Sequence, residues 1–460
     1  MPRELRGDFV TMEGDCSVPN VTVLIPIYNV EAYLSQCLDS LQAQTMQDIE
    51  FLCIDDGSTD ASGKIADMYA AKDIRFRVIH KANEGYGKTM NRGLDEARGA
   101  YVGIVEADDF ADAEMFQRLY DVVSETGADV VKSNFFNYTE SRGSVPVDLL
   151  KGCPYHVMCS AKEVPQLLQT DAFIWTSIYR NAFLRGNGIR FRETPGAAYQ
   201  DVGFMHKVTA VCRKMFLLPE SFLHYRTDRT DSSVHAIGKK AYRYNEEFMG
   251  YWTFLRQRSV EEQHVGSAAA PNMLRIYRNG VWPYIASQED IPYLMRVWEE
   301  FHRLDEEGFL IQRLWKDEEW TWIRNFLAHK EERIIAICEE KRRRIFLKEG
   351  TLSVLRNAPA LYLYGAGCVA RGLLDFLQGE GISVRGILVD SLDENPVSLE
   401  DVPVAALDDA QADCDRDIIF IATTPRKPEV QQEIFSALVQ AGYRNVIVLT
   451  KELQQALAGA

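Results

Sequence analysis

Two groups of acidic side chains follow short apolar runs in the first quarter of the chain. The first is Asp55-Asp56, followed by Gly57 in a pattern typical of a tight turn, and the second is Glu106-Ala107-Asp108-Asp109. Neighbouring carboxylates repel one another, and a divalent cation relieves that repulsion. Mg²⁺ or Mn²⁺ held by one or two carboxylates and by substrate phosphates suits the second group. We therefore predict a metal site at Glu106 and Asp108, whose side chains would share one side of an extended segment.

Polar residues also follow two other apolar runs. One run ends in Pro26-Ile27-Tyr28-Asn29-Val30-Glu31, where Asn29 is placed to cap the next helix. Another leads into Asn83-Glu84-Gly85-Tyr86-Gly87-Lys88, whose glycines would let the backbone approach an anionic ligand at a helix N-terminus. Asp55 or Asp56 could accept hydrogen bonds from a base or a ribose hydroxyl. The structural alternative for each group is a surface turn with helix-capping residues.

These polar groups fall at the ends of predicted strands. Apolar runs rich in branched residues, typical of buried parallel strands, cover 21–25, 51–54, 75–79, 101–105 and 129–136. Residues with helical spacing lie between them, which predicts a doubly wound α/β sheet. Ligands of such sheets bind beyond the carboxyl ends of the strands. Because four strand ends would meet in one crevice, a binding site is favoured over separate surface turns.

The middle of the chain, from 236 to 350, has a different pattern. Strand runs disappear, and charged residues alternate with apolar ones, which predicts a helical segment. The basic run Lys341-Arg342-Arg343-Arg344 is interpreted as a solvated helix face, and contact with an anionic membrane is the alternative.

A second series of strands and helices, from 351 to 460, predicts a small Rossmann-like α/β domain. Residues 365–370 give the pattern G-x-G-x-x-A after a strand, and Asp390 closes the next strand, as in dinucleotide-binding folds. About 100 residues supply only about half of a two-lobed dinucleotide site. A structural, regulatory or partner-docking role is therefore favoured over NAD-dependent catalysis.

The composition indicates a globular protein of two or three domains. The chain has 460 residues, 46% of them hydrophobic, and its net charge of −16 disfavours nucleic acid as a partner. Nine cysteines without a C-x-x-C pair indicate buried thiols in a reducing compartment. The polar extension 1–19 has no signal-peptide core, and no run approaches the ~20 apolar residues of a membrane span. We expect a cytoplasmic protein, with peripheral association at the inner face of the membrane and homo-oligomer formation left open.

Taken in this order, the motifs resemble the nucleotide-binding half of family 2 glycosyltransferases with the GT-A fold. The matching runs are PIYNVEAYLSQCLDSL, IDDGSTD and NEGYGKTMNRGLDEARGAYVGIVEADDF, within a domain of roughly 20–235. The resemblance implies an inverting enzyme that uses a nucleoside-diphosphate sugar, usually UDP-linked, with Mn²⁺ or Mg²⁺. It also implies a saccharide or glycoconjugate acceptor in the synthesis of surface polysaccharides or glycoconjugates.

The resemblance and the strand-end argument together assign residues to a nucleotide-sugar pocket. These residues are Pro26, Tyr28, Asn29, Glu31, Asp55, Asp56, Gly85, Lys88, Asn91 and Arg226. Many relatives carry Arg where this chain has Met90, and Lys88 would supply the missing positive charge. Asp108 would be the principal metal ligand, beside Glu106 at a position that usually holds Asp. His224 would complete the metal coordination, in a stretch that, with Ser232-Ser233, resembles a loop closing over the donor phosphates.

The acceptor side is implied by a second stretch of the resemblance. The family's catalytic Glu-Asp pair is matched here by Gln200-Asp201, and Trp175 lies in the segment that precedes it. Inversion at the anomeric carbon needs a base, opposite the leaving diphosphate, that takes the proton of the acceptor hydroxyl. Asp201 is the candidate base, with Trp175 and Gln200 on the acceptor side, and the metal would stabilise the leaving diphosphate. A helix N-cap is the structural alternative for Asp201.

Two other functions stay open at this stage. One is a nucleotide-sugar oxidoreductase or epimerase that uses the C-terminal domain. The other is a scaffold that binds nucleotide sugars without turnover.

Overall fold

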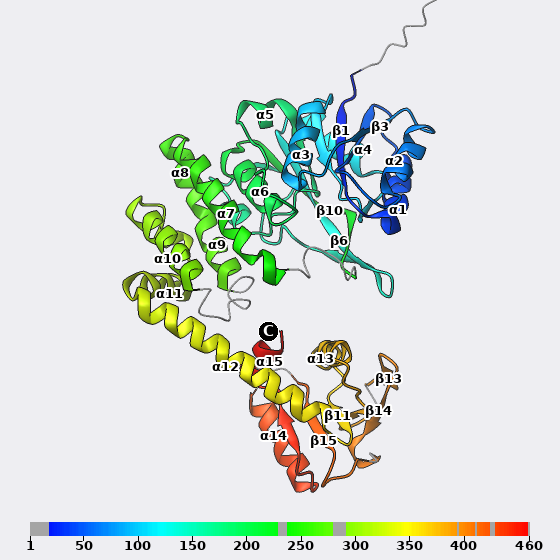
Figure 1. Ribbon diagram of the computed structural model, residues 1–460, viewed down its shortest axis with the longest axis vertical. Helices are drawn as coiled ribbons and strands as arrows, with labels where there is room; N and C mark the ends of the chain where they lie inside the picture. Colours follow the sequence, from blue (N-terminus) through cyan, green and yellow to red (C-terminus); the bar gives the residue numbers. More distant parts are fainter. Residues whose placement is uncertain are drawn as a thin grey trace, which may run out of the picture. The chain divides into compact units, whose positions relative to one another are not determined.

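A computed structural model gives the fold of this chain. It describes residues 18–228, 237–278, 291–392, 395–409, 412–423 and 428–458. The chain forms two compact units (Figure 1), which are Met1–Val281 with Arg296–Ala328, and Trp282–Met295 with His329–Ala460. The predicted helical segment 236–350 is therefore divided between the two units.

Unit 1 is built on a ten-stranded sheet. Its strands are β1 Val21–Ile27, β2 Ile49–Asp55, β3 Phe76–His80, β4 Tyr101–Ile104, β5 Phe110–Ala111, β6 Val130–Thr139, β7 Gly143–Val147, β8 Met158–Cys159, β9 Ser177–Arg180 and β10 Met215–Arg226. Their order is β3-β2-β1-β4-β9-β6-β10-β5, with β7 added beside β6 and β8 beside β10. The first four strands pair in parallel, whereas β9 runs antiparallel to β4 and β6. The predicted doubly wound sheet is confirmed, and β9 and β10 extend it beyond the predicted strands.

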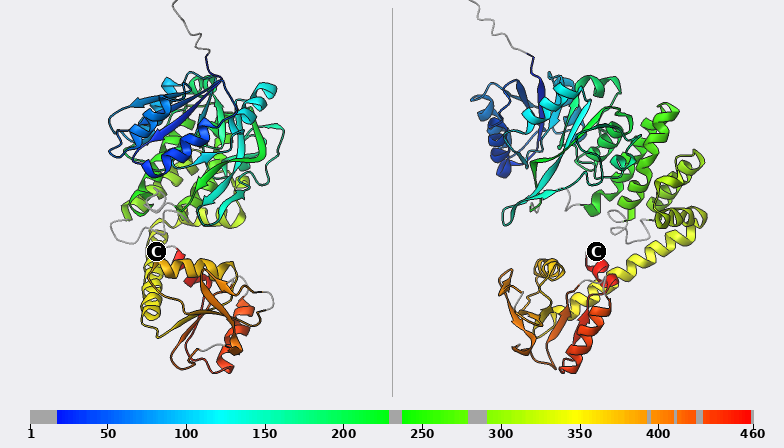
Figure 2. Two further views of the ribbon diagram at one scale, coloured as in Figure 1. Left: turned by 90° about the vertical axis from the view of Figure 1, so that its right-hand side faces the viewer. Right: turned by 180° about the vertical axis from the view of Figure 1, so that it is seen from behind.

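Helices cover both faces of this sheet (Figure 2). They are α1 Glu31–Gln42, α2 Ser62–Ala70, α3 Tyr86–Glu96, α4 Met115–Thr126, α5 Asn181–Gly186 and α6 Gln200–Val211. Leu24 faces α3, because a Cβ atom placed on Gly93 would lie 3.0 Å from its side chain. Gly103, in register with Val23, faces α4, where Phe116 would lie 2.5 Å from an added Cβ atom. Since successive strand residues point to opposite faces, α3 and α4 lie on opposite sides of the sheet.

The described part of the middle segment is helical, as predicted. It contains α7 Ile237–Arg256, α8 Val260–Gly266, α9 Ala270–Ile276, α10 Ile291–Glu306, α11 Asp317–Ala328 and α12 Lys330–Arg356. Helix α12 crosses the boundary predicted at 350 and continues to Arg356. This long helix belongs to unit 2, whereas α7, α8, α9 and α11 belong to unit 1.

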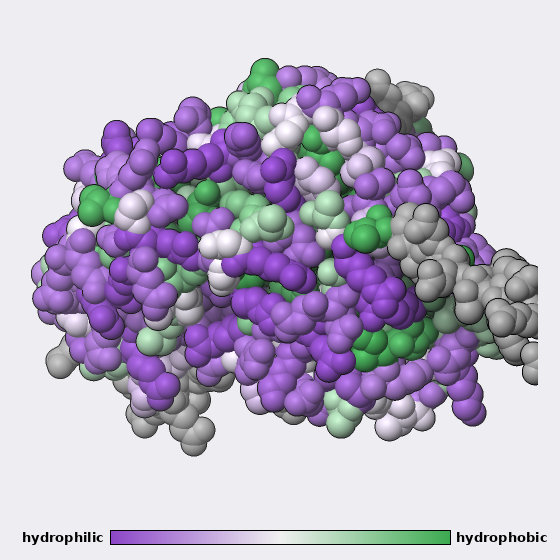
Figure 3. All heavy atoms as spheres, turned by 90° about the horizontal axis from the view of Figure 1, so that it is seen from above, coloured by the Kyte–Doolittle hydropathy of each residue, from purple (hydrophilic) through white to green (hydrophobic). Residues whose placement is uncertain are grey.

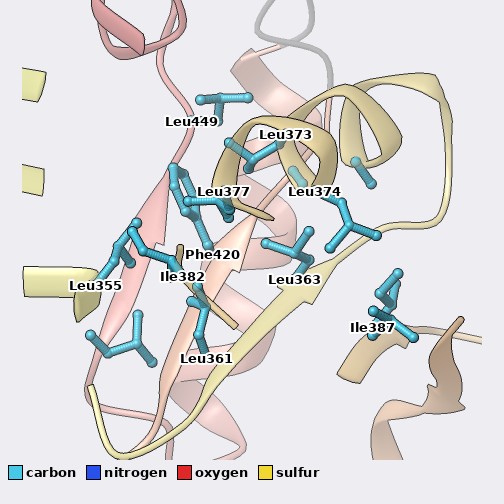
Figure 4. Close-up of a cluster of buried hydrophobic side chains, with 14 of the residues drawn as sticks. Leu355, Leu361, Leu363, Leu373, Leu374, Leu377, Ile382, Ile387, Phe420 and Leu449 are labelled. Carbon is cyan, nitrogen blue, oxygen red and sulfur yellow. The ribbon is translucent and has the colours of Figure 1, made fainter. Parts of the chain in front are cut away.

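Unit 2 contains a second, six-stranded sheet. After α12 its elements are β11 Leu361–Tyr364, α13 Cys368–Gly379, β12 Gly386–Val389, β13 Ser398–Leu399, β14 Val402–Ala406, β15 Ile418–Ile421, α14 Pro428–Gln440, β16 Val446–Val448 and α15 Lys451–Ala458. The strand order is β13-β14-β12-β11-β15-β16, and all pairs are parallel except β13 with β14. Figure 4 shows Leu361 and Leu363 of β11 beneath Leu373, Leu374 and Leu377 of α13, in one buried cluster.

The helices, the surface and the cysteines show how apolar side chains and thiols are distributed. None of the helices in the described ranges combines the length and the apolar character needed to cross a bilayer. The face seen in Figure 3 is mostly hydrophilic, with hydrophobic side chains in small separate groups. The described cysteines are free thiols, and most of them are buried, as predicted.

Candidate active site

The acidic group Glu106–Asp109 forms a tight turn after β4. The Asp109 N–H donates to the Glu106 carbonyl oxygen at 3.0 Å, so the segment is turned and not extended as predicted. Burial, followed by the charges of Asp108 and Asp201, raises the pKa of Glu106 to about 8. Asp109 does not cap a helix, because its Oδ1 accepts the backbone N–H of Arg226 at 2.9 Å. The Asp109 Oδ2 is buried without a hydrogen-bond partner among the described residues.

Asp201 comes to this turn from a distant part of the chain. It lies in the first turn of α6, and Tyr199 takes the N-cap position, so the capping alternative for Asp201 is wrong. Burial raises the pKa of Asp201 to about 6, and the charge of Asp201 contributes to the raised pKa of Glu106. The structure thus groups the predicted base with the predicted metal ligands.

Tyr86 is a member of this cluster that sequence reasoning did not identify. Its hydroxyl donates to Glu106 Oε1 at 2.6 Å. Burial, and then the charges of Glu106 and Asp201, raise the pKa of Tyr86 well above its ordinary value. The available signal was its place between Gly85 and Gly87, at the start of the helix that follows β3.

The residues that lead to Asp201, 191–200, form an approach segment held by two buried amides. Asn91 accepts from the Phe191 N–H at 2.9 Å and donates back to the Phe191 carbonyl at 2.9 Å. Gln200 donates to Thr194 Oγ1 at 2.8 Å. Both side chains were predicted to contact substrate, but their amides bind the approach segment and are buried. Their role in this structure is to shape the path to Asp201.

The glycines of the N-E-G-Y-G-K run serve the same segment. Gly85 has a φ of 91°, and a Cβ atom there would lie 2.8 Å from the Gly196 nitrogen. A Cβ atom on Gly87 would lie less than 3.0 Å from the Arg192 carbonyl oxygen. The glycines therefore admit a protein segment, and not a ligand as predicted, against the start of α3.

The polar residues after β1 bind the loop after β2. Asn29 Oδ1 accepts from the Thr59 N–H at 2.8 Å, and the helix that follows has its N-cap one residue later, so Asn29 is not the predicted cap. Glu31 Oε2 accepts from the Ala61 N–H at 2.6 Å, while Asp60 accepts from the Glu31 N–H at 3.1 Å. These reciprocal bonds tie the first turns of α1 and α2 together.

Asp56 is buried at the end of β2 and has partners on both carboxylate oxygens. It forms an ion pair with Lys81 and accepts the N–H groups of Glu84 at 2.9 Å and Gly85 at 3.0 Å. This carboxylate therefore connects the end of β2 to the loop after β3. The predicted bond to a base or ribose would be additional to these contacts.

Asp55 is likewise buried and bound within the protein. Its Oδ1 accepts from the Ser58 N–H at 2.9 Å, and its Oδ2 lies 2.9 Å from His80 Nδ1. Burial alone would raise the pKa of Asp55, but the hydrogen bonds from Ser58 and His80 lower it below its ordinary value. The second ring nitrogen of His80 lies 3.0 Å from Asp67.

Three further predicted pocket residues are less buried than Asp55 and Asp56. Tyr28 follows β1 with 51% of its surface exposed, and Pro26 is half-buried within that strand. Lys88 is exposed on α3 and forms an ion pair with Glu84 at 3.2 Å. Tyr28 and Lys88 therefore reach solvent, unlike the buried carboxylates beside them.

His224 lies in β10 and not in a loop. Its ring stacks between Phe110 and Phe136, at centroid distances of 4.4 and 4.7 Å. Its Nε2 lies 3.0 Å from Asp112, and its Nδ1 lies 2.6 Å from Ser144 Oγ. Since both ring nitrogens have protein partners, this arrangement removes His224 from the proposed metal ligands.

Arg226, the last residue of β10, reaches the acidic turn. Its Nε donates to the Asp108 carbonyl oxygen at 3.2 Å, and its guanidinium lies 4.9 Å from the ring centroids of both Tyr33 and Tyr138. The positive charge therefore lies beside Asp108, and the buried guanidinium also binds Gln36 and pairs with Glu140 and Asp228 at 3.7 Å. Ser232-Ser233 lie outside the described residues.

Trp175 is buried in an aromatic group next to the carboxylates. It stacks on Tyr225 with a centroid distance of 5.2 Å and on Phe173 at 4.7 Å. Burial, and then the charges of Asp109 and Asp108, raise the pKa of Tyr225 to about 12. Tyr225 is therefore the ring that faces the acidic turn, and Trp175 supports it from behind.

The donor set at the turn suits a metal that shares its coordination with a phosphate. Within the described ranges, no group of three His, Cys, Asp or Glu side chains is arranged to hold a metal ion. Mg²⁺ commonly uses one or two carboxylates and completes its shell with water and substrate phosphates. Glu106 and Asp108, with their mutual repulsion, fit that requirement.

The glycine motif of unit 2 has the local context that its pattern requires. Gly365 follows β11 with a φ of 107°, and Gly367 is the N-cap of α13. Asp390 follows β12 and accepts a hydrogen bond from the Tyr364 hydroxyl. The carboxylate therefore lies at the end of the neighbouring strand, as predicted, with a protein partner.

Part of the sequence of unit 1 matches the model of a known family. Residues 22–182 match the model of the family described as Glycosyl transferase family 2. These residues form a family 2 glycosyltransferase domain. Glycosyltransferase EpsJ of Bacillus subtilis, described as uncharacterized, is 33% identical over 215 residues, which cover 45% of this chain and 61% of EpsJ. Glycosyltransferase GlyG of Streptococcus pneumoniae is 43% identical over 125 residues, which cover 27% of this chain and 42% of GlyG.

The chain spans less than two thirds of both relatives. The crystal structure of S. aureus TarS 1–349 superposes with a TM-score of 0.54 at 21% identity, over 72% of this chain and 92% of that one. This likeness shows a shared fold, and the family 2 domain accordingly has the GT-A arrangement.

Proposed function

We propose that this protein is an inverting glycosyltransferase that moves a sugar from a UDP-linked donor to a hydroxyl of a saccharide or glycoconjugate. The observation that carries the proposal is the grouping of Asp201, which lies beyond the matched residues 22–182, with Glu106 and Asp108 of the family 2 domain. TarS has been crystallised with UDP-GlcNAc, and another relative is named poly(ribitol-phosphate) beta-glucosyltransferase. The first supports a UDP-linked donor, and the second supports an acceptor of the surface-polymer class.

Asp201 acts as the general base in this mechanism. Burial raises the pKa of Asp201 to about 6, so at neutral pH most molecules carry the carboxylate form that the reaction needs. Its place in the first turn of α6 keeps that charge at the positive end of the helix. The carboxylate takes the proton of the acceptor hydroxyl while the oxygen attacks the anomeric carbon from the side opposite the diphosphate.

Glu106 and Asp108 would hold Mn²⁺ or Mg²⁺ together with the donor phosphates. A bound metal supplies charge stabilisation for the leaving diphosphate. Tyr86 fixes the Glu106 carboxyl through the 2.6 Å hydrogen bond, and Arg226 places a positive charge on the same side of the turn. These contacts orient the anionic part of the donor before transfer.

The donor pocket divides into residues that touch the nucleotide and residues that shape the pocket. Tyr28 and Lys88, which reach solvent, would contact the nucleoside and the diphosphate. Asn29 and Glu31 would act through the loop bonds that they form. Asp56 would act in the same way through Lys81.

The test is a screen of UDP-, GDP- and dTDP-sugars with Mn²⁺, which measures binding by calorimetry and donor hydrolysis by release of the nucleotide. We expect a UDP-sugar to bind and to be hydrolysed slowly in the presence of Mn²⁺, and hydrolysis to disappear in Asp201→Asn. Binding without hydrolysis would indicate the scaffold alternative. Undiminished hydrolysis in Asp201→Asn would contradict the mechanism.

A further inference from the structure

A buried glutamate from outside the region matched by the family model packs on the helix that carries Asp201. Glu247 lies in α7, and its residue surface is 2% exposed. A Cβ atom on Gly203 of α6 would lie less than 3.0 Å from Glu247 Oε2. The Glu247 carboxyl group therefore occupies the space beside α6 that the missing side chain of Gly203 leaves open.

The charges around Glu247 make this carboxyl group unusual. Burial raises the pKa of Glu247 to about 8, against the lowering effect of Lys207 and Arg192, while Asp201 and Glu246 raise it further. Its Oε1 is buried without a hydrogen-bond partner in the part of the chain that the structure describes. At neutral pH Glu247 is therefore mostly a neutral acid, which contributes shape and not charge at the side of α6.

We propose that Glu247 is a positioning residue that fixes the first turn of α6, and with it Asp201. It does so by filling the notch, which is the space that the missing side chain of Gly203 leaves open on α6. Gly203 lies two residues after Asp201 in the same helix, so a shift of α6 at the notch moves the base as well. A displacement of about 1 Å at a reacting group can lower a rate by about a hundredfold. The proposal rests on the proposed function of Asp201.

The first test compares substitutions at Glu247 with a matched control at the next residue, Glu246, which is exposed. Donor hydrolysis in Glu247→Ala should show a kcat about tenfold to a hundredfold lower, with an unchanged KM for the donor. Glu247→Gln keeps the shape and should stay within about twofold of wild type, as should Glu246→Ala. A wild-type kcat in Glu247→Ala would overturn the proposal. An equal loss in Glu247→Gln would also overturn it, because charge and not shape would then decide.

The second test uses the notch itself and stays informative if Glu247→Ala folds poorly. Gly203→Ala should lower both kcat and the unfolding temperature, because its methyl group and the carboxyl group compete for one space. The double variant Gly203→Ala/Glu247→Ala should recover part of both losses, since the methyl group then fills the vacated notch. Additive losses in the double variant would overturn the proposal.

The two tests separate this inference from the proposed function. A wild-type protein that hydrolyses no donor would remove the proposed function, and the role of Glu247 with it. A wild-type protein that is active, with Glu247 variants that are equally active, would remove only the role of Glu247.

Discussion

Two regions of the family 2 domain contain carboxylates whose pKa values shift in opposite directions, downward at Asp55 and upward at Glu106. In the framework loops, which follow β1, β2 and β3, Asp55 and Asp56 have protein partners on both oxygens. In the carboxylate cluster, formed by Glu106, Asp108 and Asp201, burial raises the pKa values of Glu106 and Asp201, and the charges of Asp108 and Asp201 raise that of Glu106 further. Buried polar groups with partners stabilise a fold, whereas buried acids with raised pKa values are candidates for function.

The framework loops and the carboxylate cluster therefore have different roles. Hydrogen bonds in the framework loops hold the backbone in place, because breaking one leaves a buried polar group without a partner. The carboxylate cluster keeps charge that a cation or a proton can neutralise. We therefore expect substitutions in the framework loops to change stability first, and substitutions in the cluster to change catalysis first.

The largest effect is expected for Asp201→Asn. Donor turnover should fall by about 10² to 10⁴, the range of general-base contributions, while calorimetry shows retained donor binding. The unfolding temperature should stay equal or rise, because a neutral amide removes the cost of burying the Asp201 charge. A lower unfolding temperature in this variant would indicate that Asp201 stabilises the fold, as the framework residues do.

Asp56→Ala should have the second largest effect, which is a loss of unfolding free energy. It leaves Lys81, whose side chain is 13% exposed, with the longer 3.4 Å ion pair to the more exposed Glu84, and breaking a buried pair costs about 3 kcal/mol in unfolding free energy. Urea denaturation measures this loss. Glu106→Gln is the matched substitution in the cluster, and it should retain stability because the amide oxygen still accepts from Tyr86. Equal losses in both variants would erase the distinction between the regions.

Gly87→Ala should destabilise the contact between α3 and the approach segment. The added methyl group would meet the Arg192 carbonyl, and overpacking of this kind costs about 1–3 kcal/mol. Donor hydrolysis should fall as well, because the approach segment leads to Asp201. The control is Gly186→Ala in α5, where an added Cβ atom meets nothing within 4 Å. A Gly87→Ala protein as stable as this control would contradict the close packing.

The smallest effects are expected at two histidines whose pKa values shift in opposite directions. Hydrogen bonds that His80 donates to Asp55 and Asp67 raise the pKa of His80 above 6.5. The contribution of His80 to the free energy of unfolding is therefore present at lower pH and is lost as the pH rises. Burial lowers the pKa of His206 to about 4. The contribution of His206 to the free energy of unfolding is therefore present above pH 6.5 and is lost as the pH falls. His80→Gln should flatten the pH dependence of unfolding on the alkaline side and His206→Gln on the acid side. Identical profiles would contradict both assignments.

Much of the fold could be predicted because its signals are local. The apolar runs of β1, β2 and β4 and the helical spacing between them depend on neighbouring residues, and the structure confirms these elements. The long strand β10 was missed where His224, Tyr225 and Arg226 suggested a loop. Its pairing with β6 is a contact between distant segments that no local pattern displays.

The site was predictable in outline and not in its contacts. Resemblance to the family placed Asp201 with Glu106, and the structure groups them. It also placed Asn91 and Gln200 at the substrate, whereas their amides bind the approach segment. The reason is that an amide at the right position in the sequence can bond a ligand or a backbone equally well.

The sequence by itself therefore determined the alternation of strands and helices and the strand ends at which polar residues collect, because periodicity and turn chemistry act over a few residues. Only the tertiary structure decided which partner each polar group has. Asp56 finds Lys81, while Glu106 finds Tyr86 and Asp201. Those pairings depend on how separate loops meet in space. Hydrogen bonds outweigh burial at Asp55, whereas burial dominates at Glu106 and raises its pKa.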